Sequence, residues 1–303
     1  MKVLDNKGEL MEWDDALPVV KSEMFLFTRF NLPIYVENKF GGSTHTEEWL
    51  EDRFELYDKY CLPSIAKQAH ENFIWVVFFD VDTPKRFVDR VAAYKTVCPQ
   101  LFPVFLNKEE TQMLATWTDV IVKSLKSPSE LLIEIRLDND DALNIAFIER
   151  VYRKAKEPGK TKEIISYLYG LQYYVEKNWA FRIPYADNHF LAFIDRDYDR
   201  NKAITHILQF DHSKPNAYPY SFSLIREDCC MWMENVHGQN VANEVKLTLN
   251  QKMIEDTYFL QKSFGIDICL GGGKFKVLTF ILPRMAKLVC LKIRKRILKK
   301  THY

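Results

Sequence analysis

The sequence predicts an α/β protein built on a mixed, mostly parallel sheet that is flanked by helices. Apolar runs of strand length alternate with amphipathic helical segments between residues 24 and 158. The longest run, FIWVVFF at 73–79, is followed at once by an aspartate and is typical of a strand covered on both faces. Hydrophobic residues make up 47% of the chain, with only 10 Gly and 12 Pro, which excludes disordered, collagen-like and disulfide-scaffold proteins.

The first predicted strand is MFLFTRF at 24–30, which ends before Asn31. A helix follows the polar segment GGSTHT, where Thr44 and Glu47 have the spacing of a capping box. Pro63 is expected to open a second helix. The next predicted elements are a strand at 73–80, a helix after DTPKRF, a strand at LFPVFLN, a helix near 109–126, a strand at 131–137 and a helix at ALNIAFIERVYRKAKE.

From residue 160 the pattern changes to short apolar segments separated by turns, which predicts an antiparallel or mixed region. EIISYLYGLQYY, NHFLAFID, AITHILQFD and SFSLIRE are its expected strands. A helix around 240–264 then precedes GGG at 271–273, which is interpreted as a hinge.

The N-terminus and the cysteines indicate a cytoplasmic protein. The first residues, MKVLDNKGELMEWDD, are acidic where a signal peptide would be apolar. No run approaches the roughly 18 apolar residues of a membrane-spanning helix. The six cysteines show neither CxxC pairs nor Cys/His metal spacing, so free and mostly buried thiols are expected.

The formal net charge of +1 hides two segments of opposite sign. Residues 274–303 contain ten Lys and Arg and no acidic residue, whereas the rest holds 32 basic against 41 acidic residues, a net charge of −9. Met285, Val289, Ile293 and Ile297 are spaced by four and predict an apolar stripe on a basic helix. Such a helix binds anionic membrane surfaces. Nucleic acid and the acidic body of the protein itself are the competing partners. The apolar stripe favours lipid, and no nucleic-acid partner is expected.

The segment Asp138-Asn139-Asp140-Asp141 follows the strand at 131–137. Ligands of open α/β sheets bind beyond the carboxyl ends of strands. Three carboxylates in four residues repel one another unless a cation or hydrogen-bond donors offset them, and such oxygen ligands suit Mg²⁺ or Mn²⁺. The alternative is a turn that caps the next helix. Three carboxylates exceed what capping requires, so the sequence favours a metal site.

Several motifs together resemble the putative rhamnosyltransferase family of bacterial glycosyltransferases. They lie between residues 24 and 245, in the order of the family. They are TRFN at 28–31, Arg53 with YCLPS and Gln68, FIWVVFFD, RLDNDDAL, and MWMENVHGQN at 231–240.

The resemblance implies a GT-A fold in a single domain. Residues 24–158 would form a nucleotide-sugar-binding α/β half and 159–270 an acceptor-side half, with an N-terminal extension at 1–23 and a basic amphipathic helical tail at 271–303.

The resemblance also implies roles for individual residues. Asp138 would contact the ribose of the donor, and Asp140 would ligate the metal ion together with His237. The residues themselves offer His206 and His212, which flank LQFD, in place of His237; a surface or core role is the alternative for each. Arg29 or Arg136 would lie near phosphate, and the nucleotide pocket would be lined by Thr28, Arg29, Asn31 and Asp80.

The implied reaction needs two further functions. A divalent ion offsets the charge on a departing diphosphate. An inverting enzyme also needs a carboxylate to take the proton of the acceptor hydroxyl. Glu227 and Asp228, which follow the strand SFSLI, resemble in position the late base of inverting enzymes; a solvated turn is the alternative.

The sequence therefore predicts a metal-dependent glycosyltransferase that uses Mn²⁺ or Mg²⁺ and moves a sugar from a nucleotide-sugar donor to a glycan acceptor. The basic tail and the family suggest a lipid-linked capsule or O-antigen intermediate as acceptor, at the inner face of the cell membrane. The alternatives are a metal-dependent nucleotidyl- or phosphotransferase, which would use the same aspartates, and a catalytically inactive membrane-peripheral assembly protein.

Overall fold

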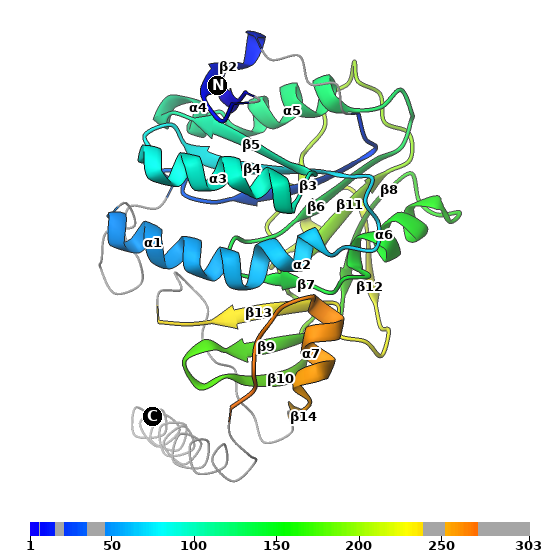
Figure 1. Ribbon diagram of the computed structural model, residues 1–303. Coiled ribbons are helices and arrows are strands. Elements are labelled where there is room, and N and C mark those ends of the chain that lie inside the picture. The colour runs from blue at the N-terminus through cyan, green and yellow to red at the C-terminus, as the bar shows by residue number, and fades with distance from the viewer. Residues whose placement is uncertain (6, 16–20, 35–45, 239–251, 272–303) are drawn as a thin grey trace, which may run out of the picture.

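A computed structural model of the chain describes residues 1–5, 7–15, 21–34, 46–238 and 252–271 (Figure 1). Four parts of the sequence predictions lie outside these residues. They are Thr44 of the expected capping box, residues 240–251 of the expected helix at 240–264, residues 272–273 of the expected hinge, and the basic segment 274–303.

The main sheet has nine strands in the described residues, in the order β12-β8-β11-β6-β3-β4-β5-β1-β2. Its centre is parallel, with β6 pairing with β3, β3 with β4, and β4 with β5. The outer strands pair mostly antiparallel, so the predicted mixed sheet is confirmed. The strands are β1 (Lys2–Leu4), β2 (Leu10–Glu12), β3 (Met24–Arg29), β4 (Ile74–Asp80), β5 (Leu101–Leu106), β6 (Leu132–Arg136), β8 (Lys162–Tyr167), β11 (Leu191–Asp195) and β12 (Ser221–Ile225).

The continuous apolar run of β4 is explained by burial on both faces of the sheet. Trp75, Val77 and Phe79 pack in the core cluster on one face. Their neighbours in the strand, Val76 and Phe78, pack in the cluster on the other face. Because successive side chains of a strand point to opposite faces, both faces must be apolar.

Helices cover both faces of the main sheet. Phe54, Phe87 and Phe147 bring three helical segments onto one face, and Ile121 brings a helix onto the other. Thr46 caps the first helix, two residues after the predicted Thr44, by accepting a hydrogen bond from Trp49 N at 3.1 Å. The elements are α1 (Glu47–Leu56), the π-helix η2 (Tyr57–Cys61), α2 (Leu62–Ala66), α3 (Lys85–Val97) and α6 (Phe147–Lys156) on the first face, and α4 (Lys108–Gln112) and α5 (Leu114–Leu125) on the second.

A second sheet of five described strands has the order β14-β10-β9-β13-β7. In Figure 1 it lies below the main sheet, and α1 and α2 cross in front where the two sheets meet. Leu260 and Phe264 of a C-terminal helix pack in its core. Its elements are β7 (Ala142–Leu143), β9 (Tyr169–Tyr174), β10 (Trp179–Pro184), β13 (Trp232–Val236), β14 (Lys252–Ile254) and α7 (Thr257–Phe264).

Several element predictions are corrected by the structure. EIISYLYGLQYY is two strands in different sheets, because the chain leaves β8 at Leu168 and enters β9. In the expected helix at 240–264, β14 precedes the helical residues that begin at Thr257. The dipeptide Ala142–Leu143 pairs with β13 before α6 begins. Short apolar runs do not distinguish these arrangements, because the partner strand decides them.

AITHILQFD at 203–211 alternates like a strand but forms the short 3-10 helix η4 (Ile207–Gln209). The backbone N–H of His206 donates to the Gln209 side chain at 2.8 Å, and that of Ile207 donates to the carboxylate of Glu134 at 2.8 Å. Side chains thus satisfy the donors that a neighbouring strand would otherwise bind.

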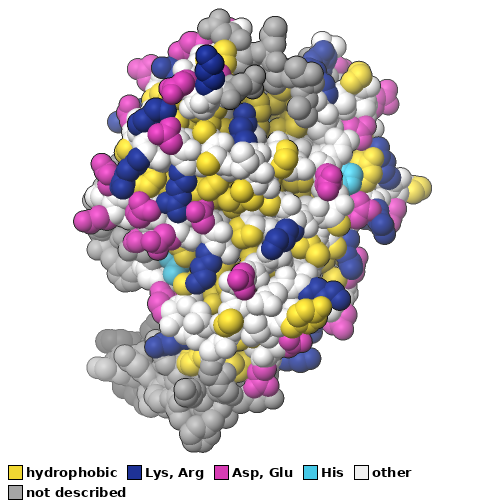
Figure 2. Space-filling model, in the orientation of Figure 1, with side chains coloured by type: hydrophobic (Ala, Val, Ile, Leu, Met, Phe, Trp, Pro, Cys, Tyr) yellow, Lys and Arg dark blue, Asp and Glu magenta, His cyan; other side chains and the backbone are white. Residues whose placement is uncertain are grey.

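The surface in Figure 2 carries acidic and basic side chains interspersed over the face shown. No helix in the described part of the chain combines the length and the apolar character needed to cross a bilayer.

Candidate active site

The loop of residues 138–141 leaves β6 at the carboxyl end of the parallel strands. Leu137 N still donates to Phe27 O of β3 at 3.0 Å, and Asp141 N closes a turn onto Asp138 O at 3.3 Å. The side chains differ in exposure, which is 37% for Asp138, 9% for Asp140 and 0% for Asp141. Buried carboxylates such as those of Asp140 and Asp141 need cations or hydrogen-bond donors around them.

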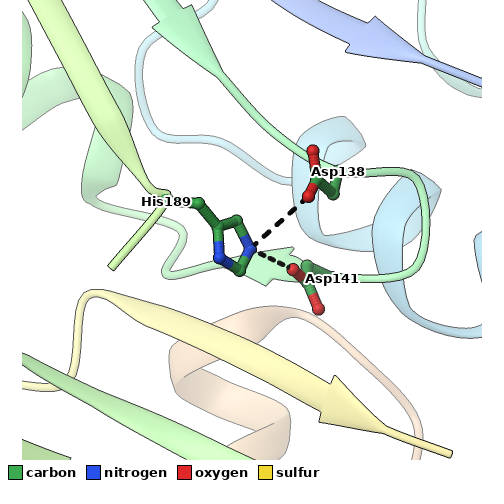
Figure 3. Close-up of side chains that lie close together, drawn as sticks. All are labelled: Asp138, Asp141 and His189. Carbon is green, nitrogen blue, oxygen red and sulfur yellow. Dashed lines mark hydrogen bonds and ion pairs between the residues drawn. The ribbon is translucent and has the colours of Figure 1, made fainter. Parts of the chain in front are cut away.

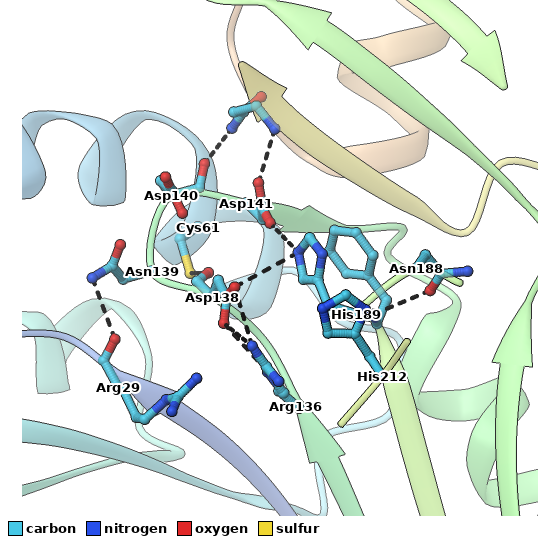
Figure 4. A network of polar contacts seen from close by, with 12 residues as sticks. Arg29, Cys61, Arg136, Asp138, Asn139, Asp140, Asp141, Asn188, His189 and His212 are labelled. Carbon is cyan, nitrogen blue, oxygen red and sulfur yellow. Dashed lines mark hydrogen bonds and ion pairs between the residues drawn. The ribbon is translucent and has the colours of Figure 1, made fainter. Parts of the chain in front are cut away.

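Asp138 is the carboxylate of this loop that solvent reaches most. Its Oδ1 lies 3.3 Å from Arg136, and its Oδ2 lies 3.8 Å from Nε2 of His189. Burial would raise the pKa of Asp138, but the charges of Arg136, His189 and Arg29 hold it well below its usual range. Asp138 is therefore ionised within a cationic surrounding (Figure 4).

Asp140 is held by Arg53 of α1 and by His237 after β13. Arg53 Nη1 lies 2.8 Å and His237 Nε2 2.9 Å from the same oxygen, Oδ2. Burial opposes ionisation, but Arg53 and His237 lower the pKa of Asp140. The structure thus brings the predicted pair of Asp140 and His237 together, and their role as metal ligands stays a prediction.

Asp141 forms a buried pair with His189. Its Oδ2 lies 2.6 Å from His189 Nε2, and its Oδ1 accepts a hydrogen bond from Asn235 N at 2.8 Å. Burial raises the pKa of Asp141, and the hydrogen bond with His189 opposes that rise. Burial would lower the pKa of His189, but the hydrogen bond of Asp141 and the charge of Asp138 raise it above its ordinary value. The two groups therefore titrate as a pair. One His189 nitrogen faces both carboxylates (Figure 3).

His189 reaches the loop because β11 runs antiparallel to β6, so that β11 begins at the edge where β6 ends. The turn before β11 is fixed by Asn188, whose Nδ2 donates to Tyr167 O at 3.0 Å and to Tyr185 O at 2.7 Å. His212 lies next to His189, with ring centroids 5.9 Å apart. The sequence pattern around His189 does not point to the site, because only the strand order reveals its position.

The motif from Arg53 to Gln68 supports the aspartate loop from the side of α1, η2 and α2. Ser64 Oγ accepts a hydrogen bond from Leu143 N at 3.3 Å. Gln68 donates to Asn144 O at 2.9 Å and accepts from Ile148 N at 3.1 Å. Together with the Arg53 contact, these bonds fix the loop and the chain that follows it. The motif is thus explained by its contacts with residues 139–148.

Asn139 fixes the other side of the loop. Its Nδ2 donates to Phe30 O at 2.7 Å and to Arg29 O at 3.3 Å, which ties the loop to the end of β3. Arg29 and Arg136 extend from adjacent parallel strands on the same face, since Phe27 is the partner of Arg136 in the register. Two arginines on the same face of neighbouring strand ends suit a phosphate-bearing ligand.

The other residues of the predicted nucleotide pocket lie at the ends of β3 and β4. Thr28 is fully buried, and its hydroxyl accepts a hydrogen bond from Trp75 Nε1 at 3.0 Å. Asn31 bridges Thr83 Oγ1 and Asp80 N, at 3.0 Å each. Asp80 accepts from Asp82 N at 2.9 Å. The structure places these residues at one edge of the sheet, and their nucleotide contacts stay a prediction.

The two predicted catalytic bases form ion pairs with arginines of other elements. Glu227 and Asp228 follow β12, which three inter-strand spacings, roughly 14 Å, separate from β6. Glu227 forms an ion pair with Arg150 of α6, and Asp228 forms one with Arg182 of β10. The role of both acids in catalysis remains a prediction.

Among the described residues, the group able to hold a metal ion consists of Asp138, Asp141 and His189, whose ligand atoms lie within 4.8 Å of one another. Asp140 and His237 offer the same kinds of ligand atom 2.9 Å apart. Carboxylate oxygen with imidazole nitrogen suits Mn²⁺ and related divalent ions. The donor chemistry of the loop therefore fits a divalent cation.

One of the comparisons with known proteins identifies a family. A family model described as "Putative rhamnosyl transferase" matches residues 26–248. No curated protein sequence matches the chain at the significance required.

Similar solved structures include S. aureus TarS 1–349 in complex with UDP (12% identity, TM-score 0.40) and the same fragment alone (13%, 0.38). Each match covers 70% of this chain and 60% of the TarS fragment. A further match is to the structure of S. aureus TarS, with 12% identity and a TM-score of 0.38. It covers 70% of this chain and 36% of that protein chain.

Proposed function

We propose that this chain, which belongs to the putative rhamnosyl transferase family, is a glycosyltransferase that transfers a sugar from a nucleotide-sugar donor to a glycan acceptor with the help of a divalent cation. The observation that carries this proposal is the carboxylate loop 138–141 at the carboxyl edge of the parallel strands, with Arg29 and Arg136 beside it. Ligands of open α/β sheets bind at this edge.

The donor would bind where the site is most exposed. Arg29 and Arg136 would contact the diphosphate, because guanidinium groups pair with phosphate oxygens in two-pronged geometry. Asp138, ionised and partly exposed, would accept hydrogen bonds from the ribose hydroxyls. Asp80, Asn31 and Thr28 would complete the nucleotide pocket.

Two sets of residues could hold the cation. The first is Asp140 with His237, as predicted from the sequence, and the second is Asp138, Asp141 and His189. When bound, a divalent ion offsets the negative charge that develops on the departing diphosphate. In both sets the protein residues hold the ligand atoms in place before the ion binds, since Arg53 orients Asp140 and Asn235 orients Asp141.

The acceptor side is proposed on the sequence and on the family. The acceptor would be a lipid-linked glycan intermediate of a capsule or O-antigen, used at the inner face of the cell membrane by a protein bound through residues 274–303. Glu227 or Asp228 would act as base in an inverting reaction; the substitution that removes this base, Glu227→Gln or Asp228→Asn, should then lower kcat by about 100-fold or more.

The deciding experiment is a thermal-shift panel of nucleotide sugars and plain nucleoside triphosphates, with and without Mn²⁺, followed by transfer assays with the nucleotide sugars that bind. We expect stabilisation by one class of nucleotide sugar that depends on Mn²⁺ and is lost in Asp140→Ala. Asp89→Ala, an exposed aspartate on α3, serves as a control for removal of an aspartate elsewhere. Stabilisation by triphosphates alone would instead support a nucleotidyl- or phosphotransferase. Metal-dependent transfer by Asp140→Ala would refute Asp140 and His237 as the cation ligands and leave the set of Asp138, Asp141 and His189.

A further inference from the structure

The connection between β11 and β12, residues 196–220, crosses one face of the main sheet and returns. We call it the crossing segment. It starts after Asp195, which pairs with Leu132 at the beginning of β6, and it ends before Ser221, which pairs with Glu163 near the beginning of β8. Both of its ends therefore lie at the sheet edge opposite to the aspartates. Between them, however, His212 lies beside His189 at the active site (Figure 4).

Glu134 of β6 fixes the crossing segment to the sheet. The side chain is completely buried. One carboxylate oxygen lies 2.6 Å from His206 Nδ1, and the other accepts a hydrogen bond from Ile207 N at 2.8 Å. A buried carboxylate is costly unless its oxygens are bonded. Both oxygens of Glu134 are bonded to consecutive residues of the crossing segment.

The residues around this contact hold the segment rigidly. His206 Nε2 lies 3.6 Å from Asp119 of α5, so the imidazole is placed between two carboxylates. Ile207 and Phe210 are buried in the core, where Phe210 packs edge-on against Phe193 of β11 at 5.5 Å. The position of η4 is thus set from the sheet below and from α5.

The path from η4 to the active site is also fixed by hydrogen bonds. Asp211 N donates to the Tyr218 hydroxyl at 2.6 Å, and that hydroxyl donates to Gln209 O at 3.2 Å. His212 Nδ1 lies 2.9 Å from Asp187 O. A carbonyl oxygen only accepts, so Nδ1 carries the proton and Nε2 is the ring nitrogen left to meet a ligand.

We infer that Glu134 is a positioning residue, which holds His212 in the wall of the donor site, and that His212 contacts the nucleoside diphosphate part of the donor. This inference rests on the proposed function for the nature of the ligand. Glu134 itself lies in the interior of the sheet and acts through the crossing segment.

The test combines hydrogen exchange with a double-mutant cycle in the full-length protein. Glu134→Gln should speed amide exchange in a peptide spanning 205–214. It should also weaken binding of the best ligand among UDP, GDP and dTDP about tenfold, as expected for the loss of one hydrogen bond to a charged ligand. His212→Ala should weaken binding to the same degree. Because Glu134 acts through His212, adding Glu134→Gln to His212→Ala should cause no further loss.

The matched control is the pair of His70 and Glu149, in which a histidine Nδ1 also meets a glutamate, at 3.1 Å. Glu149→Gln should leave exchange at 205–214 and ligand affinity unchanged. His206→Asn, which breaks the contact from the other side, should reproduce Glu134→Gln and replaces it if that variant does not fold.

Unchanged exchange at 205–214 in both variants would overturn the positioning role of Glu134. Faster exchange with unchanged ligand affinity would overturn the contact of His212 with the donor. So would an equal loss of affinity when Glu134→Gln is added to His212→Ala instead of to wild type. If the wild-type protein bound none of the three diphosphates, the proposed function would fail together with the role of His212, and the exchange data would still decide whether Glu134 fixes the segment.

Discussion

Arg53 offsets the charge of Asp140 in a buried ion pair of the candidate site, and its removal tests how the aspartate loop is held. Its guanidinium is 6% exposed and lies 2.8 Å from Asp140. Breaking such a pair leaves a buried charge and costs about 3–5 kcal/mol. Arg53→Met should therefore lower the free energy of unfolding in urea by about 3 kcal/mol at pH 7, since His237 still contacts Asp140.

The control for this prediction is Arg90→Met. Arg90 also forms ion pairs, with Glu51 and Asp58, but it is 28% exposed. Surface pairs contribute about 0–1 kcal/mol. Equal losses in the two variants would show that Asp140 does not depend on Arg53.

His206 makes the stability of the protein depend on pH. Burial would lower the pKa of His206, but the charge of Glu134 and then that of Asp119 raise it above the ordinary value. Its contribution to folding is fully present below the unfolded-state pKa of about 6.5 and is lost as pH rises through the raised folded-state pKa. The difference in unfolding free energy between wild type and His206→Gln should thus be largest near pH 6 and shrink toward alkaline pH. Urea unfolding across this range measures it, and a difference that grows with pH would contradict the charge of His206.

The residues of the site could be predicted only where they lie in a continuous motif. Asp140 and His237 come from two such motifs, and the structure places them 2.9 Å apart. His189 lies in NHFLAFID, a segment that looks like any buried strand, and it meets Asp141 only because β11 runs antiparallel to β6. Glu227 and Asp228 were predicted as the base from their position late in the chain. That position does not show how far they lie from the aspartates, because β8 and β11 separate β12 from β6.

At the scale of elements, Gly170 decides whether β9 and β13 can lie side by side. A Cβ at this position would come within 2.0 Å of the buried ring of Trp232. The pairing of these strands leads the chain to Asn235 and His237 at the site. Gly170→Ala should therefore destabilise the protein by about 3 kcal/mol, at the upper end of overpacking costs, as measured by urea unfolding.

Two further variants check the cause of this effect. Gly238→Ala is the control, because a Cβ there would meet only Glu176 Oε1 at 3.6 Å. Trp232→Leu is destabilising by itself, but it removes the ring, so adding Gly170→Ala to it should cost much less than adding it to wild type. Additive losses would mean that the contact with Trp232 is not the cause.

Elements could be predicted where the pattern of apolar residues was sufficient. The run of β4 needs both faces covered, and its burial on both faces follows from its composition. Residues 203–211 alternate equally well, but their backbone donors bond to Gln209 and Glu134 instead of to a strand. Glu134 is the deciding residue, and it lies 72 positions away from His206 in the chain.

At the scale of the whole molecule, the two sheets meet at the candidate site. β6 of the main sheet leads into the aspartate loop, and β7 of the second sheet begins directly after it. Contacts to the loop therefore come from both sheets, with His189 from the first and Asn235 from the second. The α/β class and the mixed sheet could be predicted from local patterns. The division of residues 160–236 between two sheets depends on long-range pairing and could not.

The distribution of charge over the whole chain leads to the last prediction. Residues 274–303 carry ten basic side chains and no acidic one, and the rest of the chain carries a net charge of −9. Each basic residue near an anionic bilayer contributes about 1 kcal/mol, so binding should be substantial even if only half of them engage. Because the Debye length shortens with salt, binding should weaken steeply between 0.1 and 0.5 M NaCl.

The full chain should therefore sediment with vesicles that contain phosphatidylglycerol, and a chain ending at residue 273 should stay in the supernatant with its nucleotide affinity intact. Vesicles of phosphatidylcholine alone control for the lipid charge, and equal sedimentation of both chains with the anionic vesicles would show that this segment is not what binds the membrane.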